Sequence, residues 1–494
     1  MRCLLYLLFS LLIIAGCSNR KTTLAWEQNF PVIGSQSSPR TIDINHDGTD
    51  DIIMGACKNE YIPNDQAVLA LDGKTGNLLW TTDAPDQVYG SATLVDITGD
   101  NNKDVIISGR WGYLRALDGQ NGKTIWNYSY TDSIDPILKH TRFNFYNSVL
   151  VPDQNGDGIE DILIQNGGNH RAAPNDSIHR YPGILMVMDS KSGKILAADS
   201  MPDGKESYMS PLYFKSKNGI DYIVFGSGGE TFNGHLFVAA FTDLMTKNLK
   251  NAKIVATDAS GHGYIAPPVA ADFNEDGQVD IACISHSSKI TVIDGNSLST
   301  LWEKQIPNTE SSNSFSVGKY NDDNIPDLFT FVSKGVWPQS TGSVQIALNG
   351  KDGSLIYTDS LGCAGFSSPV SYDLNKDGIE EVIISINEYD CNRGYTSESV
   401  LQITNKLIAI NLKTHQVQQI DQTHGFKNIY STPLICDLDH DGYLDIIYNQ
   451  YYSHNYDLLS FLGMRIKRIQ SSVKIKENIR WGGYMGTQNN GIYK

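Results

Sequence analysis

The sequence contains few charged residues and a shortage of basic ones. Charged residues make up 19% of the 494 positions, and 39 lysines and arginines against 55 aspartates and glutamates give a formal net charge of −16. This excess of acid argues against binding to a phosphate backbone, so we expect no nucleic-acid partner. After the N-terminal segment there is also no apolar run long enough to cross a bilayer. The core is therefore expected to form inside a soluble body.

Motifs of common catalytic sites are also missing. The chain has no Gly-x-Ser-x-Gly nucleophile turn, no His-Glu-x-x-His zinc motif and no glycine-rich loop that would cradle a phosphate. These absences favour a protein that binds rather than catalyses.

The N-terminus carries an export signal. Arg2 precedes an apolar run over residues 3–14 that is too short to span a bilayer, and Ile14-Ala15-Gly16-Cys17 follows. This stretch resembles the lipobox of bacterial lipoproteins, which implies that residues 1–16 are a signal peptide and that Cys17 is lipidated; an ordinary secretory signal is the alternative. Residues 17–21 would be a short tether to the membrane. Ser18-Asn19-Arg20-Lys21 has no acidic run, so we expect a periplasm-facing protein, with the outer membrane as the preferred location.

Cysteines are few. Apart from Cys3 and Cys17, the mature chain has five, at positions 57, 283, 363, 391 and 436. An odd number cannot pair completely within one chain. Export to the envelope would allow one or two disulfides, whereas Cys283 and Cys436 lie in apolar strand-like segments typical of buried thiols.

What the chain does have is an acidic repeat, with its sharpest copy at residues 437–445. Asp437, Asp439 and Asp441 stand two residues apart, Gly442 permits a sharp turn, and Asp445 occupies the ninth position before an apolar strand. Oxygen ligands that converge in this way suit calcium, and the following strand places the loop in a β-hairpin rather than between helices. For one copy alone, an Asp-Gly hairpin turn without metal would be the alternative.

Five other segments repeat the pattern, so six intact loops are predicted to bind about six structural calcium ions. The predicted ligands are Asp43, Asn45, Asp47, Asp51, Asp96, Thr98, Asp100, Asp104, Asp153, Asn155, Asp157, Asp161, Asp272, Asn274, Asp276, Asp280, Asp373, Asn375, Asp377, Glu381, Asp437, Asp439, Asp441 and Asp445. Six divalent ions would supply about 12 positive charges and leave a net charge of about −4.

Two further units are degenerate. Residues 210–225 keep the hairpin pattern and lose the ligands, and the sixth unit has Lys319 where the others have a first carboxylate. An ammonium group can replace the ion electrostatically, so we expect no metal in the sixth unit.

The second half of each unit forms another hairpin pattern. Residues 67–80 and 116–126 both contain Ala-Leu-Asp-Gly and end in a tryptophan. Four strands per unit and a period of roughly fifty to sixty residues are typical of a β-propeller. We therefore predict an all-β, eight-bladed β-propeller of four-stranded antiparallel blades over residues 22–494, with seven blades as the alternative. Leu24-Ala25-Trp26 resembles Leu78-Leu79-Trp80, so the N-terminal strand is expected to complete the last blade.

The repeats resemble two known families. The acidic half is similar to the FG-GAP (VCBS-type) repeats of integrin α-chain propellers, where calcium sits in the hairpin between the first two strands of a blade. The other half resembles the tryptophan-docking motif of quinoprotein-like (PQQ-like) propellers, which implies that Trp80, Trp126 and Trp302 wedge between blades. Quinone-dependent members use two adjacent cysteines, which this chain lacks, so no quinone is expected. The acidic loops are expected at the blade periphery, committed to calcium and not to acid–base chemistry.

The opposite face would carry long irregular loops in which aromatic residues neighbour arginine and histidine. Such groups suit a sugar or peptide, although they also occur on solvated loops without a ligand. The candidate ligand-binding residues are His170, Arg171, Tyr389, Arg393, Tyr452 and His454. A late basic stretch around Arg465, Lys467 and Arg468 is expected to be an outer-edge strand protected by charge, with contact to anionic lipid or glycan as the alternative.

Together these features predict a non-enzymatic, calcium-stabilised binding or scaffold lipoprotein of the bacterial cell envelope. It would be membrane-anchored through its lipid and would recognise a protein or glycan ligand. A polysaccharide-active, lyase-like enzyme and a partner in outer-membrane protein assembly are the alternatives, the second because the lipoprotein of that machinery is also an eight-bladed propeller.

Overall fold

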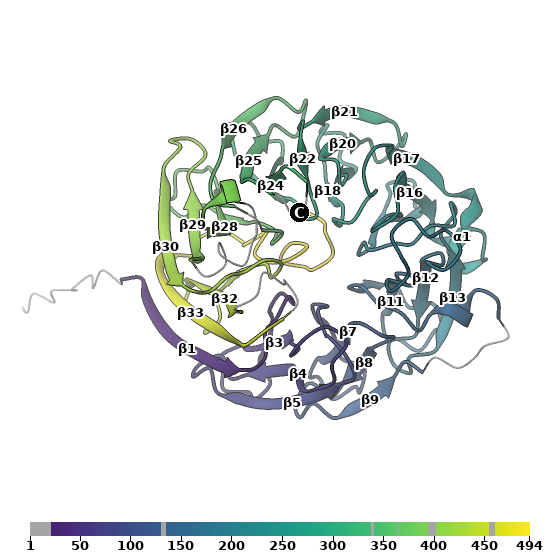
Figure 1. Cartoon of the computed structure of the whole chain (residues 1–494), viewed down its shortest axis with the longest axis horizontal. Helices are drawn as coiled ribbons and strands as arrows, with labels where there is room; N and C mark the ends of the chain where they lie inside the picture. Colours follow the sequence, from purple (N-terminus) through teal and green to yellow (C-terminus); the bar gives the residue numbers. More distant parts are fainter. Residues whose placement is uncertain (1–20, 130–134, 337–339, 364, 394–401, 454–459) are drawn as a thin grey trace, which may run out of the picture.

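The chain forms a closed ring of eight β-sheets, each a blade of an all-β propeller (Figure 1). This computed structural model describes residues 21–129, 135–336, 340–363, 365–393, 402–453 and 460–494. The signal segment and Cys17 lie outside the described residues, as does His454. Within the described residues, no helix combines the length and the apolar character that a membrane crossing requires.

Seven blades follow one another along the chain, and each runs from an inner strand to an outer one (Figure 1). The first four are β2 (Arg40–Ile42), β3 (Asp51–Gly55), β4 (Asn64–Leu71) and β5 (Leu78–Ala84); β6 (Thr93–Val95), β7 (Asp104–Ser108), β8 (Leu114–Leu117) and β9 (Thr124–Asn127); β10 (Val149–Val151), β11 (Asp161–Asn166), β12 (Ile184–Met188) and β13 (Ile195–Ser200); β14 (Leu212–Lys215), β15 (Asp221–Gly226), β16 (Gly234–Ala240) and β17 (Lys253–Asp258). Short helices interrupt them at η1 (Leu138–His140), α1 (Phe241–Met245) and η2 (Leu249–Asn251).

The next three blades keep this order, and blade 6 gains a short extra strand. They are β18 (Val269–Ala271), β19 (Asp280–Ile284), β20 (Lys289–Ile293) and β21 (Thr300–Gln305); β22 (Thr309–Glu310), β23 (Ser316–Gly318), β24 (Asp327–Lys334), β25 (Ser343–Leu348) and β26 (Leu355–Asp359); β27 (Val370–Tyr372), β28 (Glu381–Glu388), β29 (Thr404–Ile410) and β30 (Val417–His424). The turn η3 (Cys391–Arg393) follows β28.

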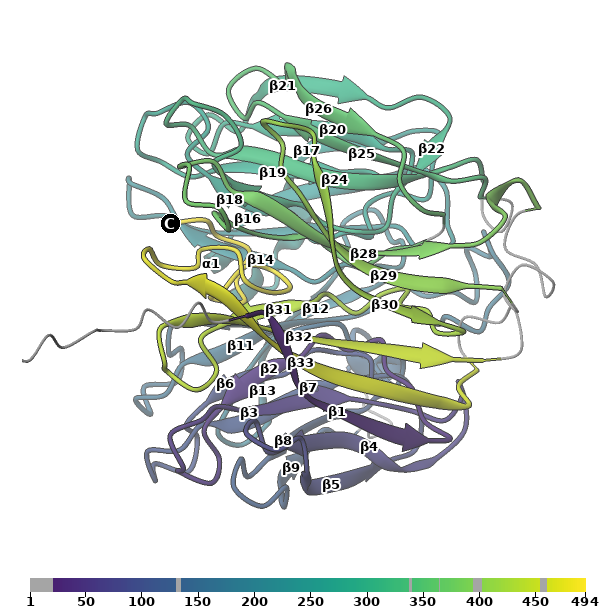
Figure 2. The ribbon, with the colours of Figure 1, turned by 90° about the vertical axis from the view of Figure 1, so that its left-hand side faces the viewer.

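Blade 8 combines both ends of the chain. Its inner strands are β31 (Leu434–Cys436), β32 (Tyr443–Tyr452) and β33 (Gly463–Lys474), and β1 (Thr23–Pro31) is the outermost strand, antiparallel to β33. Figure 2 shows β1 lying across β33 at the rim. The expectation that the N-terminal strand completes the last blade is therefore confirmed, as are eight blades in place of seven.

Blade-on-blade packing explains why the second strands are apolar throughout. All five residues of β3 are buried, as are those of β7 and β19, because neighbouring blades cover both faces of each sheet. The buried side chains form a series of clusters around the ring, each shared by adjacent blades. The core is therefore distributed around the axis.

The basic stretch near the C-terminus is not an outer edge, so that expectation was wrong. β33 lies between β1 and β32, and Lys467 and Arg468 are buried. Arg465 points to the rim and pairs with Glu27 of β1 at 3.0 Å. Charge is kept inside the blade here because each cation has a carboxylate partner.

Two different faces result from this topology. The hairpins that join strands 1 and 2, and strands 3 and 4, lie on one side of the ring, which we name the hairpin face. The connections between strands 2 and 3, together with the links between blades, lie on the other side, which we name the loop face. Figure 1 views the loop face, and in Figure 2 β33 ends on the same side as the C-terminus, which is the hairpin face.

Candidate functional site

The acidic loops all lie on the hairpin face. Each joins the two innermost strands of a blade, so the expectation of a peripheral position was wrong. In the first loop, the Asp43 carboxylate accepts hydrogen bonds from the backbone N–H groups of Asp47 at 3.2 Å and Gly48 at 3.1 Å. Gly48 has φ +83°, a left-handed conformation that glycine adopts without a steric penalty. The same pattern recurs at Asp272 and Asp373.

The ninth residue of each loop is buried, and in three of the loops it ties two hairpins together. Asp51 accepts hydrogen bonds from Ile44 N–H at 2.9 Å and from Gly73 N–H at 2.8 Å, and Gly73 belongs to the hairpin between strands 3 and 4. Asp104 and Asp280 make the equivalent pairs of bonds. Burial raises the pKa of Asp51 to about 6, because the charged carboxylate loses water there. These residues act as links between hairpins whatever else they bind.

One loop gathers three acidic groups tightly enough for a metal ion. The carboxylates of Asp437, Asp439 and Asp441 offer oxygens that all lie within 4.8 Å of one another, and no other group of three or more acidic, histidine or cysteine residues does so within the described chain. The other five loops have Asn or Thr at the middle position, which supplies a neutral oxygen in place of a carboxylate. Asp437 Oδ1 is buried and has no hydrogen-bond partner among the described residues, which fits a cation there. Ion binding by the six loops stays a prediction.

The same loop also has a cation supplied by the chain. The Arg468 guanidinium donates to Asp439 Oδ2 at 2.6 Å and to Asp445 Oδ2 at 3.0 Å, and its Nη1 donates to the Gly73 carbonyl of blade 1 at 3.1 Å. Blade 8 has no Asp-Gly turn after its third strand, so Arg468 supplies the donors that a glycine N–H supplies elsewhere. Asp445 is thus neutralised without a metal ion.

The loop face carries a row of aromatic rings and guanidinium groups, which we name the arginine ladder. It comes from the loops of blades 1 and 2, the link that follows blade 2, and the loop of blade 3. Its members, in spatial order, are Arg110, Tyr61, Arg171, Trp111, Phe143 and Arg142.

Arg171 is clamped in the middle of the ladder. Its Cζ atom lies 4.4 Å from the centre of the Tyr61 ring and 4.2 Å from that of the Trp111 ring. Attraction between a cation and the electron-rich faces of aromatic rings favours this arrangement. Trp111 then meets Phe143 edge-on at 6.2 Å, and Arg142 lies 5.3 Å from the Phe143 ring. The two rings hold the Arg171 guanidinium through two contacts, and its N–H groups have no carboxylate partner among the described residues.

The two rings of the clamp stand on strained backbone. Tyr61 has φ +64° and Trp111 has φ +55°, in the left-handed region that bulky residues seldom adopt. Tyr61 is 44% exposed and Trp111 is 41% exposed, so burial does not explain the strain. Strained conformations of this kind occur mainly where the surrounding structure holds a residue for function.

His170 lies beside the ladder and is 8% exposed. Its ring stacks parallel to Tyr61 at 5.8 Å and stands edge-on to Phe143 at 6.1 Å. Neither ring nitrogen has a hydrogen-bond partner among the described residues. Burial and the nearby charges of Arg110, Arg171 and Arg180 lower the pKa of His170 to about 3, so the imidazole is neutral at pH 7.

The remaining charges of this sector are paired. Arg110 forms an ion pair with Glu60 at 2.8 Å. Arg180 is buried and pairs with Glu206 and Glu230, and it donates to the carbonyl of Ala172 at 2.8 Å, which fastens the loop that carries His170 and Arg171. In the described part of the chain, Arg142 and Arg171 have no carboxylate within 4.0 Å. The sector therefore presents Arg142 and Arg171 as exposed cations without a carboxylate partner in the described part of the chain.

The ligand-binding residues predicted from the sequence fall into separate sectors. His170 and Arg171 lie at the ladder on blade 3, whereas Tyr389 and Arg393 follow β28 on blade 7 and Tyr452 ends β32 on blade 8. Arg393 forms an ion pair with Asp390 at 3.2 Å. The candidate ligand-binding residues predicted from the sequence did not include Tyr61, Trp111 and Phe143. An aromatic residue next to glycine in the short turn Arg110-Trp111-Gly112 is a signal that could have identified Trp111.

The tryptophan-docking prediction is confirmed. The indole N–H groups of Trp80, Trp126 and Trp302 donate to backbone carbonyls of the next blade, at Gly119, Ser190 and Gly350, with distances of 2.9, 2.8 and 2.7 Å. Trp26 does the same from blade 8 to Gly73 of blade 1 at 2.9 Å. Indole groups thus join blade 1 to 2, blade 2 to 3, blade 5 to 6 and, at the closure of the ring, blade 8 to 1.

Comparison with known proteins identifies the family of this chain. Residues 44–364 match the profile of the FAM234A/B beta-propeller family over more than half of the chain, so the chain belongs to that family. No curated protein matches significantly by sequence.

Solved structures share the fold. The quinohemoprotein alcohol dehydrogenase of Comamonas testosteroni superimposes with a TM-score of 0.55 at 12% identity, covering 93% of this chain and 78% of that one. A europium-containing methanol dehydrogenase gives a TM-score of 0.56 at 10% identity, covering 91% and 93%. BamB from Moraxella catarrhalis gives 0.46 at 13% identity, covering 91% and 98%. At such identities the likeness concerns the propeller fold alone.

Proposed function

We propose that this propeller is a non-catalytic binding module of the bacterial cell envelope, which holds a protein or glycan ligand on its loop face. The observation that carries the proposal is the clamped guanidinium of Arg171 between two exposed rings. The clamp fixes a hydrogen-bonding edge and two apolar surfaces before any ligand arrives, and such preorganisation lowers the entropic cost of binding.

The rigid support under the clamp favours binding over catalysis. Arg180 holds the loop of blade 3 through Glu206, Glu230 and Ala172, and Arg110 holds the loop of blade 1 through Glu60. A histidine that acts as a catalytic base must reach the substrate and take up a proton. His170, the nearest histidine, is buried and electrostatically disfavoured from taking up a proton.

A ligand array tests this function. Detergent-purified full-length protein would be applied to printed glycans and to peptides from envelope proteins, in parallel with Trp111→Ala. We expect the wild type to retain ligands that the variant loses, because the variant removes one wall of the clamp. The control is Trp302→Phe, a blade-docking residue away from the ladder, which should keep the binding pattern. Equal retention of every ligand by wild type and Trp111→Ala would contradict the proposal. Shortened or unsaturated glycan products in the eluate would favour a polysaccharide-active enzyme instead.

The acidic loops are proposed to be structural calcium sites that stabilise the hairpin face. The support is the converging carboxylates of Asp437, Asp439 and Asp441 and the buried oxygen of Asp437 without a partner. Calcium at 100 times its dissociation constant would stabilise the folded state by about 2.7 kcal/mol per site. We expect a calcium chelator to lower the melting temperature and added calcium to restore it, with magnesium less effective. A melting temperature that is unchanged by chelation would contradict structural calcium.

Membrane anchoring through Cys17 is proposed from the lipobox resemblance. β1 begins at Thr23, so the tether would meet the ring at the rim of blade 8. Labelling with a palmitate analogue should mark the wild type and spare Cys17→Ser, and the variant should leave the membrane fraction. Labelling of both proteins to the same extent would rule out Cys17 as the lipid site.

A further inference from the structure

The arginine ladder has cations that the folded chain leaves without carboxylate partners. Of the four arginines in this sector, Arg110 and Arg180 are paired with Glu60, Glu206 and Glu230. Arg142 and Arg171, both exposed, have no such partner within the described residues. A protein with a net charge of −16 has many carboxylates available, so two arginines in one row without such a partner indicate a surface that takes an external anion.

The geometry of the clamp restricts the kind of anion. Because the Arg171 guanidinium lies against two aromatic rings, it meets a ligand through its remaining N–H groups, whose fork matches the two oxygens of a carboxylate or sulfate. The rings of Tyr61 and Trp111 flank that edge and remain 44% and 41% exposed. A ligand must therefore offer an oxyanion and an apolar surface within one small unit.

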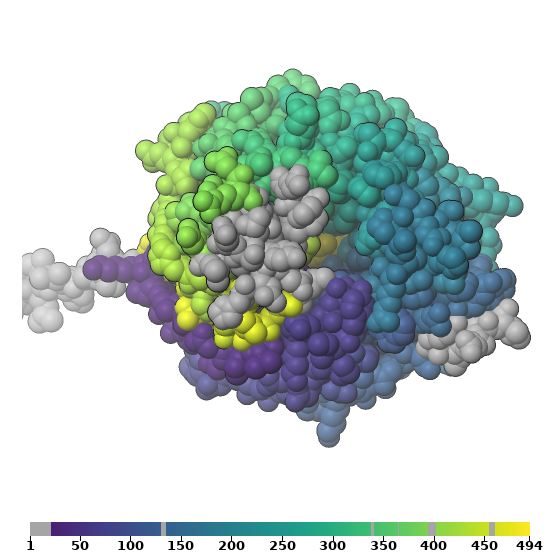
Figure 3. Space-filling model, in the orientation of Figure 1, coloured from purple at the N-terminus to yellow at the C-terminus, as the bar shows by residue number. Residues whose placement is uncertain are grey.

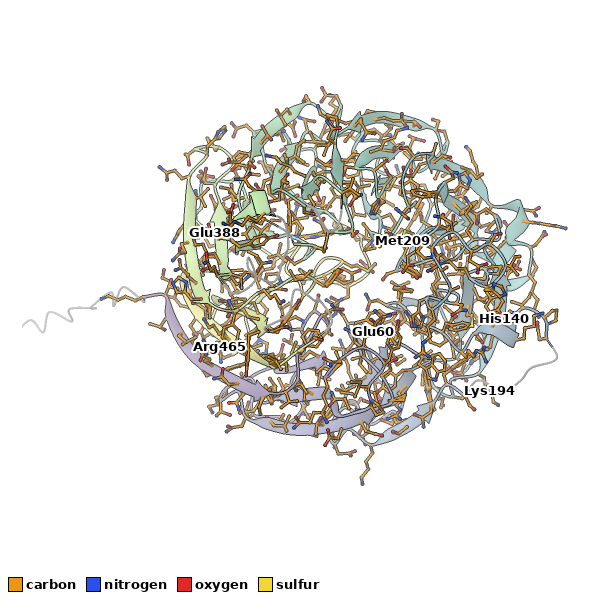
Figure 4. The ribbon with its side chains drawn as sticks, in the orientation of Figure 1. Glu60, His140, Lys194, Met209, Glu388 and Arg465 are labelled. Atoms are coloured by element: carbon orange, nitrogen blue, oxygen red, sulfur yellow. A yellow bond between two sulfur atoms is a disulfide. The ribbon has the colours of Figure 1, made fainter. Side chains whose placement is uncertain are left out.

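The ladder also requires an elongated ligand. Its aromatic side chains and arginines come from three blades. Figure 4 shows Glu60, which pairs with Arg110, on the inner part of the propeller. It shows His140, two residues before Arg142 in the sequence, towards the rim. Figure 3 shows the surface of the loop face hollowed near the axis, beside the first of these loops. A single small molecule would cover only part of this radial row.

An independent observation places an unused polar group at the same row. His170 is more than nine-tenths buried, lies against Tyr61, and neither of its ring nitrogens has a partner among the described residues. A buried polar atom without a partner costs free energy, so such atoms usually meet water or a ligand. The imidazole can donate from one nitrogen and accept at the other, which suits a hydroxyl group.

From these contacts we propose that the arginine ladder binds an anionic polysaccharide, with sugar rings against Tyr61 and Trp111 and acid groups on Arg171 and Arg142. An acidic sugar combines a carbon–hydrogen face, hydroxyl groups and an oxyanion in one repeating unit, so it offers partners to both the exposed rings and the guanidinium groups. An acidic peptide would offer carboxylates without the stacking face. This inference rests on the proposed binding function and specifies its ligand.

Binding measurements on the full-length protein test the inference. The probes are polygalacturonate for carboxylated sugars, dextran sulfate for sulfated ones, dextran as the neutral polymer and polyglutamate as the acidic peptide. We expect binding to at least one of the two anionic polysaccharides, at least about tenfold weaker or absent binding to dextran and polyglutamate, and weakening as sodium chloride rises from about 50 to about 500 mM. The preferred probe identifies carboxylate or sulfate as the anion.

Variants connect the binding to the ladder. Arg171→Gln and Trp111→Ala should each weaken binding by about tenfold or more, and Arg171→Lys should fall between wild type and Arg171→Gln because it keeps the charge and loses the planar edge. The matched control is Arg465→Gln. Arg465 also stacks on a ring, 4.6 Å from Phe426, but it is already paired with Glu27 on blade 8, so its loss should leave the affinity unchanged. Unchanged melting temperatures would show that the variants fold.

The outcomes separate the two levels of the proposal. Tight binding to dextran or to polyglutamate, or binding that is indifferent to Arg171→Gln while Trp111→Ala still abolishes ligand retention on the array, would overturn the anionic polysaccharide and preserve a binding function at this face. Binding of none of the probes, together with an array pattern unaffected by Trp111→Ala, would overturn both.

Discussion

Individual side chains show how the fold keeps a group in a state that water would not favour. The imidazole of His170 is enclosed by Tyr61 and Phe143, with three arginines close enough to oppose a second positive charge. A histidine in the unfolded chain has a pKa of about 6.5, so below that pH the unfolded state takes up a proton that the folded state refuses. The native loop of blade 3 is therefore sensitive to acid at one residue.

The expected result is a loss of stability as the pH falls. The pKa of His170 is about 3 in the folded state and about 6.5 in the unfolded state. Above pH 6.5 neither state is protonated there and the protein has its full free energy of unfolding. Between pH 6.5 and pH 3 only the unfolded state takes up the proton, so the free energy of unfolding falls. His170→Gln should remove up to about 3 kcal/mol of the difference between pH 7 and pH 4, measured by urea unfolding. His179→Gln is the matched control, since the His179 side chain is 66% exposed. Equal pH slopes for wild type and His170→Gln would contradict this assignment.

At the scale of the strand and hairpin, the blades are joined by indole groups. Gly122 has φ +71°, and a Cβ atom at this position would lie 2.6 Å from Cε3 of Trp80, so the glycine makes room for the ring. Trp80 reaches across to donate to the Gly119 carbonyl and is 8% exposed. Each such contact buries a large ring and satisfies a buried donor at once.

Removing one docking tryptophan should therefore be costly. Trp80→Ala is expected to lower the free energy of unfolding by about 3–5 kcal/mol through the lost burial and cavity, and Trp80→Phe by less because only the hydrogen bond and part of the ring are lost. The neighbouring Leu79, which is 37% exposed, provides Leu79→Ala as a control with a much smaller effect. Chemical denaturation of the three variants measures these differences, and equal losses at positions 79 and 80 would contradict the docking role.

The calcium loop of blade 8 has a second source of positive charge. Arg468 is 2% exposed and contacts both Asp439 and Asp445, of which the Asp445 side chain is 1% exposed. Replacement by Met leaves a buried carboxylate without its cation, which typically destabilises a protein by about 3–5 kcal/mol. The released Asp439 oxygen then becomes available to an ion.

We expect Arg468→Met to be destabilised strongly in chelator and to recover part of the loss when calcium is added. The measurement is the midpoint of urea unfolding with and without calcium. Arg465→Met at the rim of the same strand should lose less than about 1 kcal/mol and show the wild-type response to calcium. A deficit of Arg468→Met that is identical in chelator and in calcium would argue that the loop does not take an ion.

The elements were predictable where one rule governs every repeat. The spacing of Asp437, Gly442 and Asp445 predicted the hairpin because the turn and the ninth-position carboxylate are local, and Trp80 marked the outer strand by its distance from Asp72-Gly73. Of the six ladder residues, only Arg171 was among the candidates from the sequence, together with its neighbour His170. His170 and Arg171 follow one another in the sequence, whereas Tyr61 and Trp111 come from other blades and meet Arg171 only when the ring closes. Lys467 and Arg468 misled for the same reason, because their carboxylate partners lie far from them along the chain.

In the whole molecule, two sets of contacts close the ring, one at its outer rim and one near its axis. At the rim, β1 pairs with β33 and places Trp26 against blade 1. Near the axis, the C-terminal segment 475–494 crosses the hairpin face and bonds to inner strands of several blades. It accepts from Ile435 N–H at 2.7 Å through the Gly482 carbonyl, from Ser371 N–H at 3.0 Å through Trp481, and from Ala270 N–H at 2.8 Å through Gly491. Figure 1 shows this yellow segment passing through the centre of the ring.

Truncation after Lys476 should therefore weaken closure of the whole ring rather than one blade. The backbone N–H groups of Ile435, Ser371 and Ala270 would lose their partners, and Trp481, which is 1% exposed, would no longer fill the hub. Since each lost hydrogen bond costs roughly 1 kcal/mol and the indole adds about 3 kcal/mol or more, we expect a loss of at least about 5 kcal/mol. Trp481→Ala should reproduce about half of it, and Lys494→Ala, at an exposed terminal residue, none. Thermal unfolding and limited proteolysis would measure the effect. If the truncated chain had the melting temperature and the protease resistance of the wild type, pairing of β1 with β33 at the rim would be enough to close the ring. The C-terminal segment would then contribute nothing to closure.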